Sequence, residues 1–376
     1  MDVRPTLSTT TLENGERRMQ DTENRRPPAH VGWRWALIGL AVAGSAVAFG
    51  YVGGWLAPER LSPKKIVDSL EANGGAHPGY RRNHAKGICV GGYFEGNGAL
   101  QSFSSSAVFA KERTPVVGRL AIPGGNPYAA DSSVPIRSFA LRFDLADGEQ
   151  WRTGMNAMPV FPVSTPQAFY DLQVATHPDP KTGKPDPAKA GAFFGSHPET
   201  GAFLGWAKTA KPPASYATET YQSINAFYLR DSAGERRAVR WKMVPETPET
   251  GDGSPAAGDT DYLAADLSKR LAAGPLRWHL IMTFASDGDP IDDAAKAWPD
   301  DRKSVDAGTL VIDSWQDQAT GPCRDVNYDP TILPKGIETS NDPLLAARSA
   351  AYADSYLRRT SEEGHLPGAA RPKEAK

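Results

Sequence analysis

Two residues near the carboxyl end of the chain have types and spacing that suggest metal chemistry. Arg348 and Tyr352 are four positions apart in a segment of helical pattern, so their side chains share one face of the predicted helix. A guanidinium beside a phenol favours the charged phenolate, and a phenolate is one of the axial ligands that haem iron accepts. The alternative is an ordinary packing or surface contact, which most Arg–Tyr pairs on helices are.

Two further segments carry polar residues that could act on a bound substrate. His84 lies within the run RRNHAKG, and an imidazole can accept and return a proton. Asn156 lies within GMNAMPVF, and an amide can donate a hydrogen bond to a developing charge. The alternatives are a hydrogen-bonded core histidine and a turn asparagine.

Strands are predicted through the middle of the chain, where they must position these residues. Apolar and polar residues alternate in 136–145 and again in 277–284, which is the period of a strand with one dry face. Residues 221–230 and 237–244 flank the turn-forming segment 231–235 and predict a hairpin. Several such strands predict an antiparallel sheet closed into a barrel or sandwich.

Helices are predicted at the two ends of this strand region and within it. Ser62 caps a helix that starts at Pro63 and stops near Gly74, and a second helix spans 260–273. A third spans 342–359, with Asn341 or Asp342 as its N-cap and Pro343 as its first residue. Loops are expected at 178–192 and 245–260. Residues 62–360 therefore read as one domain, followed by a flexible tail at 361–376.

In their order along the chain, the three chemical segments resemble the signatures of the haem catalase superfamily. Arg81 to Gly87 is similar to its distal histidine segment, R-x-x-H-A-K-G, and Asn156 to Phe161 is similar to N-x-x-P-V/I-F. Arg348 and Tyr352, after Asp342 and Leu345, are similar to its proximal R-x-x-x-Y. The resemblance covers roughly residues 65–357, and it implies an α+β fold, a catalase-like antiparallel β-barrel with surrounding helices that bind haem b.

The resemblance also implies a role for each matched residue. His84 would be the distal base, Asn156 the distal hydrogen-bond donor, and Tyr352 the ligand of the haem iron, held as phenolate by Arg348. The family's pattern implies four further contacts to the cofactor. Arg81 and Arg119 would meet the haem propionates, and Phe161 and Phe169 would pack on the haem.

The activity that the resemblance implies is peroxide reduction through a ferryl intermediate. A neutral imidazole takes the proton of the peroxide and returns it to the departing oxygen. Organic hydroperoxides and hydrogen peroxide are the expected substrates, and the electron donor is unknown.

Departures from the family's pattern favour a small catalase-related peroxidase over a full-size catalase. Full-size catalases carry a serine two positions after the arginine matched by Arg119, where this chain has Ala121. The expected C-terminal helical region is missing as well, which would leave the pocket more open to bulky hydroperoxides. A dismutating catalase, a fatty-acid hydroperoxide isomerase and a low-turnover haem sensor stay open as alternatives.

The N-terminal part of the chain predicts a membrane anchor. Residues 36–58 contain no charged residue, which is long enough for a transmembrane helix. The anchor is placed at 35–57, after a disordered cytoplasmic tail at 1–34. On its N-terminal side lie Arg17, Arg18, Arg25, Arg26 and Arg34, and on the other side lie Arg60, Lys64 and Lys65. The excess of positive charge is N-terminal, so the positive-inside rule places the body outside the cytoplasm, in the periplasm. A cleaved signal peptide, with Ala46-Val47-Ala48 as its cleavage site, is the alternative.

Composition excludes several other classes of protein. A net charge of −2 gives no field for nucleic acid. Cys89 and Cys323 have no metal-ligand spacing, and we expect two free buried thiols rather than a disulfide. The acidic run 286–293 lacks the frame of a calcium loop and is expected to be an exposed helix N-terminus.

Overall fold

The computed structural model describes residues 31–53, 56, 60–247 and 259–365. It divides into two compact units, Met1–Ser62 and Pro63–Lys376. Residues 1–30 of the expected tail, most of the expected loop 245–260 and residues 366–376 lie outside the described part. The second unit carries all of the expected chemical residues.

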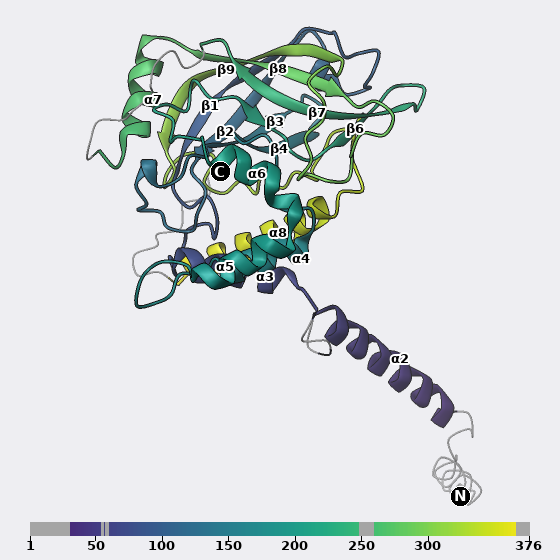
Figure 1. The fold of residues 1–376 in the computed structure, drawn as a ribbon. Helices are drawn as coiled ribbons and strands as arrows, with labels where there is room; N and C mark the ends of the chain where they lie inside the picture. The colour runs from purple at the N-terminus through teal and green to yellow at the C-terminus, as the bar shows by residue number, and fades with distance from the viewer. Residues whose placement is uncertain (1–30, 54–55, 57–59, 248–258, 366–376) are drawn as a thin grey trace, which may run out of the picture. The chain divides into compact units, whose positions relative to one another are not determined.

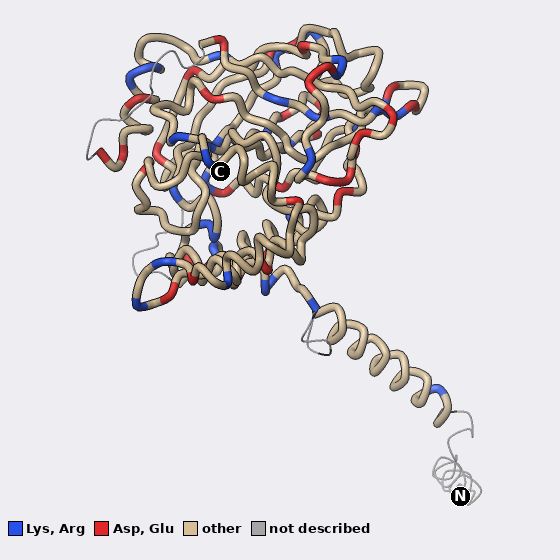
Figure 2. Tube along the Cα trace, viewed as in Figure 1, with Lys and Arg blue, Asp and Glu red and all other residues tan. Residues whose placement is uncertain are grey.

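The first unit contains one described helix, α2 (Val31–Val52). It begins inside the tail expected at 1–34 and ends five residues before the expected end of the anchor. Figure 2 shows it as an almost uncharged segment. Residues Gly32–Val52 are long and apolar enough to cross a membrane, a test that a signal sequence near the N-terminus also passes.

The second unit is built on an antiparallel barrel (Figure 1). Eight strands follow the order β7-β5-β4-β3-β2-β1-β9-β8, and pairing of β7 with β8 closes the ring. Two short strands, β6 and β10, extend the sheet beside β7. The strands are β1 (Gly87–Gly96), β2 (Arg113–Ala121), β3 (Ser138–Asp144), β4 (Gln150–Asn156), β5 (Tyr221–Gln222), β6 (Phe227–Arg230), β7 (Arg236–Pro245), β8 (Leu276–Phe284), β9 (Ser304–Asp317) and β10 (Ile337–Thr339).

The interior of the barrel is filled by the alternating apolar residues that the sequence predicts. Phe139, Leu141 and Phe143 of β3 are fully buried. The rings of Phe143 and Trp151 stack with their centroids 4.7 Å apart, and Trp278 of β8 packs against Phe139. The barrel is therefore a packed core, and any ligand site must lie outside it.

The hairpin predicted from 221–230 and 237–244 is only partly present. Its first strand is broken into β5 and β6 by residues 223–226, where Ile224 has a φ of 65°. A branched residue in this left-handed region interrupts a strand. The interruption turns Asn225 out of the sheet, and Asn225 becomes part of the site described below.

Helices α3, α4, α5 and α8 gather along one side of the barrel (Figure 1), and contacts link α3 to α8 and α4, and α4 to α5. The helices of the body are α3 (Pro63–Gly74), α4 (Pro166–Ala175), α5 (Pro187–Ser196), α6 (Gly201–Ala207), α7 (Tyr262–Ala273) and α8 (Pro343–Glu363), with 3-10 turns at Ala107–Phe109, Asp131–Ser133 and Pro198–Thr200. The predicted starts of α3 and α8 at Pro63 and Pro343 are confirmed. The side chain of Asp342 caps α8 by accepting a hydrogen bond from the Leu344 amide at 2.9 Å.

Two local predictions are wrong. The loop expected at 178–192 contains the start of α5, because Asp186 caps the Ala188 amide and Pro187 takes the first helical position. The acidic run 286–293 forms turns rather than a helix start. Asp289 is paired with Arg302 at 2.7 Å and Asp293 accepts from Ser164 at 2.6 Å, and the described residues contain no cluster of three potential metal ligands.

Candidate active site

A cavity of about 230 Å³ lies beside the barrel and is lined by strands β2, β3 and β4 and by helices α3, α4 and α8. One water needs only about 10–15 Å³ of such space, so the cavity has room for a large organic group. The eight predicted site residues all line it: Arg81, His84, Arg119, Asn156, Phe161, Phe169, Arg348 and Tyr352. Segments that are far apart in the sequence therefore meet at one place.

Tyr352 and Arg348 reach the cavity from α8. The Arg348 guanidinium lies 5.9 Å from the centre of the Tyr352 ring, as the four-residue spacing predicts. It donates to the Asn225 side-chain oxygen at 2.5 Å and to the Gly154 carbonyl at 3.2 Å. Asn225 in turn donates to Asp342 at 2.7 Å. This chain of contacts joins the start of α8 to its middle and fixes where the guanidinium points.

Gly154 of β4 lets the strand and α8 approach closely at this point. A Cβ atom at residue 154 would lie 3.1 Å from an Arg348 nitrogen and 3.5 Å from the Tyr352 hydroxyl oxygen. An alanine at this position would therefore crowd the Arg348 guanidinium and make ordinary contact with the Tyr352 hydroxyl. The absence of a side chain at Gly154 thus lets both groups lie against β4.

His84 faces the cavity from a turn with unusual backbone geometry. Its φ is 55°, a region that few residues other than glycine adopt. The Asn83 side chain holds the turn, because its oxygen accepts from the His84 amide at 2.9 Å and from the Gly124 amide at 2.8 Å. The Nδ1 atom of His84 is buried with no hydrogen-bond partner among the described residues.

The environment of His84 keeps its imidazole neutral. Burial lowers the pKa of His84 to about 3, and the positive charges of Arg119, Arg348 and Arg81 act in the same direction. A neutral imidazole can accept a proton at neutral pH.

Asn156 stands at the end of β4 with its amide oriented by Ser138. The Ser138 hydroxyl donates to the Asn156 side-chain oxygen at 2.5 Å. Because the oxygen is engaged in this contact, the Nδ2 group is left as the donor toward the cavity. Phe161 and Phe169 complete an apolar wall, with ring centroids 5.8 Å apart and an interplanar angle of 27°.

Arginines are the only charged side chains that line the cavity in the part of the chain that the structure describes. They are Arg81, Arg82, Arg119, Arg348 and Arg359, and no carboxylate is among the lining residues. Arg82 is paired with Glu71 and Glu362 away from the cavity.

Arg119 is buried and Arg81 is half-buried, and both donate to oxygen atoms that carry no full charge. Burial lowers the pKa of Arg81 to about 9 and that of Arg119 to about 10. The Arg119 Nε atom is buried without a hydrogen-bond partner. Buried cations of this kind need an anion. A large, flat, mostly apolar group with carboxylates at one edge fits this lining, and haem has this chemistry.

The sequence motifs did not identify three residues of the site. Arg359 is buried and lies seven residues after Tyr352, a spacing that puts both on one helix face and could have revealed it. Ser138 and Asn225 act through contacts between segments that are 18 and 123 residues apart, which no local pattern shows.

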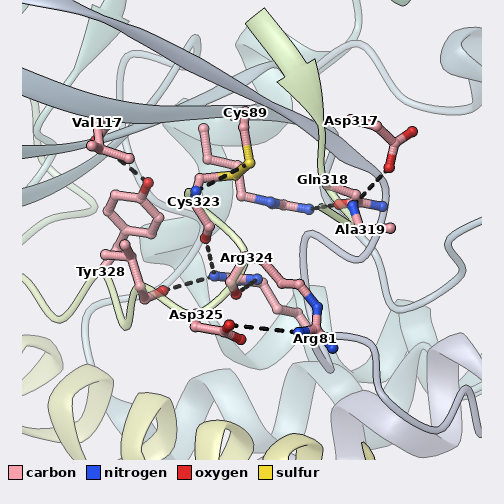
Figure 3. The surroundings of a disulfide bond; sticks show 12 residues. Arg81, Cys89, Val117, Asp317, Gln318, Ala319, Cys323, Arg324, Asp325 and Tyr328 are labelled. Atoms are coloured by element: carbon pink, nitrogen blue, oxygen red, sulfur yellow. Dashed lines mark hydrogen bonds and ion pairs between the residues drawn. A yellow bond between two sulfur atoms is a disulfide. The ribbon is translucent and has the colours of Figure 1, made fainter. Parts of the chain in front are cut away.

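The expectation of two free thiols is wrong. Cys89 and Cys323, which are 234 positions apart in the sequence, form a disulfide (Figure 3). Both are fully buried, as expected of free cysteines too. The pairing depends on β1 meeting the segment after β9, which sequence spacing does not reveal.

Comparison with protein-family models gives one match, the model described as Catalase, over residues 65–373. A catalase-related peroxidase of Synechococcus elongatus is 36% identical over 330 residues, which are 87% of this chain and 97% of that protein. A catalase-related peroxidase of Mycolicibacterium paratuberculosis is 31% identical over 310 residues, 80% of this chain and 95% of that protein.

Longer proteins match over part of their length. A catalase of Pseudomonas aeruginosa is 30% identical over 299 residues, and the match covers 75% of this chain and 57% of that protein. The structure of a fungal catalase superposes with a TM-score of 0.68 at 22% identity, covering 81% of this chain and 64% of that chain. At this identity the superposition shows a shared fold.

Proposed function

This chain belongs to the catalase family, among the small catalase-related peroxidases, and on that premise we propose that it reduces organic hydroperoxides and hydrogen peroxide with haem b held by Tyr352. The observation that carries the proposal is the cavity itself. It combines a buried neutral imidazole, an amide donor, a tyrosine beside an arginine, and buried cations without carboxylates.

The residues on α8 would hold the cofactor. Tyr352 would ligate the iron through its phenol oxygen, with the Arg348 guanidinium beside the ring. Arg81 and Arg119 would bind the propionates, for which a guanidinium fork is suited. Phe161 and Phe169 would pack on the ring. When bound, haem supplies the electrons that break the oxygen–oxygen bond of the peroxide.

His84 and Asn156 would control the transfer of the hydroperoxide's proton. His84 would accept the proton of the hydroperoxide at Nε2 and return it to the oxygen that leaves as alcohol or water. The Nδ2 group of Asn156 would donate to that departing oxygen. Two electrons and two further protons, which an external organic reductant provides, reduce the remaining oxygen to water and complete the reaction.

We also propose that α2 anchors the protein in a membrane with the body outside the cytoplasm, in the periplasm. The excess of arginine before α2 supports this orientation. The Cys89–Cys323 disulfide supports it independently, because disulfides persist in oxidising compartments and are rare in the cytosol.

The test of the cofactor proposal is the visible spectrum of the purified full-length protein, with Tyr352→Phe beside it. We expect a Soret band with high-spin ferric features that is lost or shifted in this variant. Tyr356→Phe, on the same helix and the same cavity, is the matched control and should leave the spectrum unchanged. Absence of haem from protein expressed with ample haem would overturn the proposal.

Activity assays separate the proposed function from its rivals. Reduction of an organic hydroperoxide that requires a donor supports a peroxidase, whereas rapid oxygen release from hydrogen peroxide indicates a dismutating catalase. Rearranged products without any donor indicate a hydroperoxide isomerase. The unpartnered Nδ1 of His84 favours one further rival, a haem sensor with little turnover. That rival predicts that His84→Ala leaves the low activity unchanged.

A further inference from the structure

The Cys89–Cys323 disulfide lies directly behind two of the arginines that line the cavity. Cys89 is the cross-strand partner of Arg119 in the pairing of β1 with β2. Cys323 belongs to a short segment, Cys323–Val326, between β9 and β10. The two sulfur atoms share an apolar cluster with Val326 and Tyr328, and Tyr352 packs against that cluster. One layer of side chains therefore separates the disulfide from the proposed cofactor site.

Arg81 takes its direction from the segment Cys323–Val326. Its guanidinium donates to the carbonyls of Cys323 at 3.2 Å, Arg324 at 3.2 Å and Val326 at 2.7 Å. Figure 3 shows the Arg81 side chain reaching these backbone oxygens beside the disulfide. No carboxylate contacts this guanidinium among the described residues, so carbonyls of one short segment set its position.

The segment Cys323–Val326 contains no helix or strand of its own. Its backbone bonds are local, from Arg324 to Gly321 and from Val326 to Cys323, and they span at most three residues. The Cys323 amide donates to the Cys89 sulfur at 3.2 Å. Ion pairs of Arg324 with Glu363 and of Asp325 with Arg359 connect the segment to α8, whereas the disulfide is its covalent link to β1 of the barrel.

We propose that the Cys89–Cys323 disulfide is a positioning element for Arg81, which it holds ready for an anionic group in the cavity. This inference rests on the proposed function, in which that group is a haem propionate. Without the disulfide the three carbonyls are released from β1, Arg81 loses its fixed direction, and the cofactor is held less tightly. The site would then be fully formed only in protein that has been oxidised.

The experiment is a double-mutant cycle on the full chain, read as the rate of haem loss to an excess of a haem-scavenging apoprotein. The four proteins are the wild type, Cys89→Ala/Cys323→Ala, Arg81→Ala, and the combination. We expect removal of the disulfide to speed haem loss by about tenfold, as the loss of one charge-assisted hydrogen bond does. In the Arg81→Ala background the same removal should change the rate by less than about twofold.

The unfolding free energy of each protein provides the reference for a purely structural effect. A disulfide that only stabilises the fold would raise the rate of haem loss equally in both Arg81 backgrounds, and equal factors overturn the proposal. A wild type that binds no haem would instead overturn the proposed function, so the two failures are distinguishable.

A second variant covers the case in which the cysteine variants do not fold. Gly321→Ala keeps the disulfide, but its Cβ would lie 2.7 Å from the Cys89 sulfur and 2.8 Å from the Asp317 carbonyl oxygen, so the segment must shift. We expect faster haem loss that again depends on Arg81. An unchanged rate of haem loss, or an increase that is equal in Arg81→Ala, contradicts the proposal.

Discussion

At the scale of single residues, His84 must meet two requirements as a base: its imidazole must be neutral, and its ring must be oriented. Burial and three nearby arginines keep the imidazole neutral, whereas none of the residues that the structure describes orients it through Nδ1. A hydrogen-bond partner is therefore not needed to keep the imidazole neutral, but it is needed to fix the orientation of the ring. The two requirements lead to two separate predictions.

The first prediction concerns pH. Because the pKa of His84 is lowered to about 3, the neutral form dominates above that value and protonation sets in only near it. The kcat/KM for an organic hydroperoxide should therefore show no loss of the His84 base as pH falls from 7 to about 5. The measurement is a pH profile in wild type and His84→Gln. An acidic limb near the ordinary histidine pKa of about 6.5 that is absent in the variant would contradict the prediction.

The second prediction concerns Ala121. This residue is buried, lines the cavity with His84 and lies opposite Gly87 in the β1–β2 pairing. In Ala121→Ser a hydroxyl can pair with Nδ1, and an unpartnered buried polar group costs about 1–3 kcal/mol. We expect kcat/KM to rise several-fold and thermal stability to increase.

The control for Ala121→Ser is Ala121→Val, which adds volume without a hydroxyl. It should raise neither kcat/KM nor stability. If the valine variant gains as much as the serine variant, the effect is one of packing and the hydrogen-bond argument is wrong.

At the scale of elements, the site depends on the close approach of β4 and α8. Gly154→Ala places a Cβ 3.1 Å from Arg348 and 3.5 Å from the Tyr352 hydroxyl, so the arginine must give way by a few tenths of an ångström. We expect a shifted haem spectrum and a rate of haem loss raised several-fold. Gly205→Ala on α6 is the control, because its Cβ would meet nothing within 4 Å. Identical spectra for Gly154→Ala and wild type would show that the approach is looser than described.

Elements with a strong local pattern could be predicted from the sequence. The alternation in β3 and β8 identified the barrel strands, and Asp342 with Pro343 marked the start of α8 within one residue. The ordered motifs also identified eight residues, all of which line the cavity. These features depend on residues that are neighbours in the sequence, so a local pattern is enough to predict them.

The features that sequence could not reveal depend on contacts between distant segments. The break between β5 and β6 places Asn225 beside Arg348, although nothing in residues 221–230 indicates it. The start of α5 was hidden because Pro, Lys and Gly around it suggest a loop. Pairing of Cys89 with Cys323 requires knowledge that β9 lies beside β1.

At the scale of the whole molecule, α2 and the body form two separate units, so the anchor can be tested independently of the catalytic site. Deletion of residues 1–60 should move the protein from the membrane fraction to the soluble fraction. Each haem contact proposed here lies after residue 60, so the haem spectrum should persist. Fractionation of cells followed by spectroscopy measures both effects. Wild-type protein of reduced length in the soluble fraction would indicate cleavage of a signal peptide instead.

The order of the chain has a consequence for how the protein is made. His84 follows the first helix of the body, whereas Tyr352 belongs to its last helix, α8. A ribosome must therefore finish nearly the whole body before both walls of the cavity exist. Cys323, the second partner of the disulfide, is also made late. If haem binds as proposed, an unfinished polypeptide lacks one wall of its site, so we expect cofactor insertion to follow synthesis.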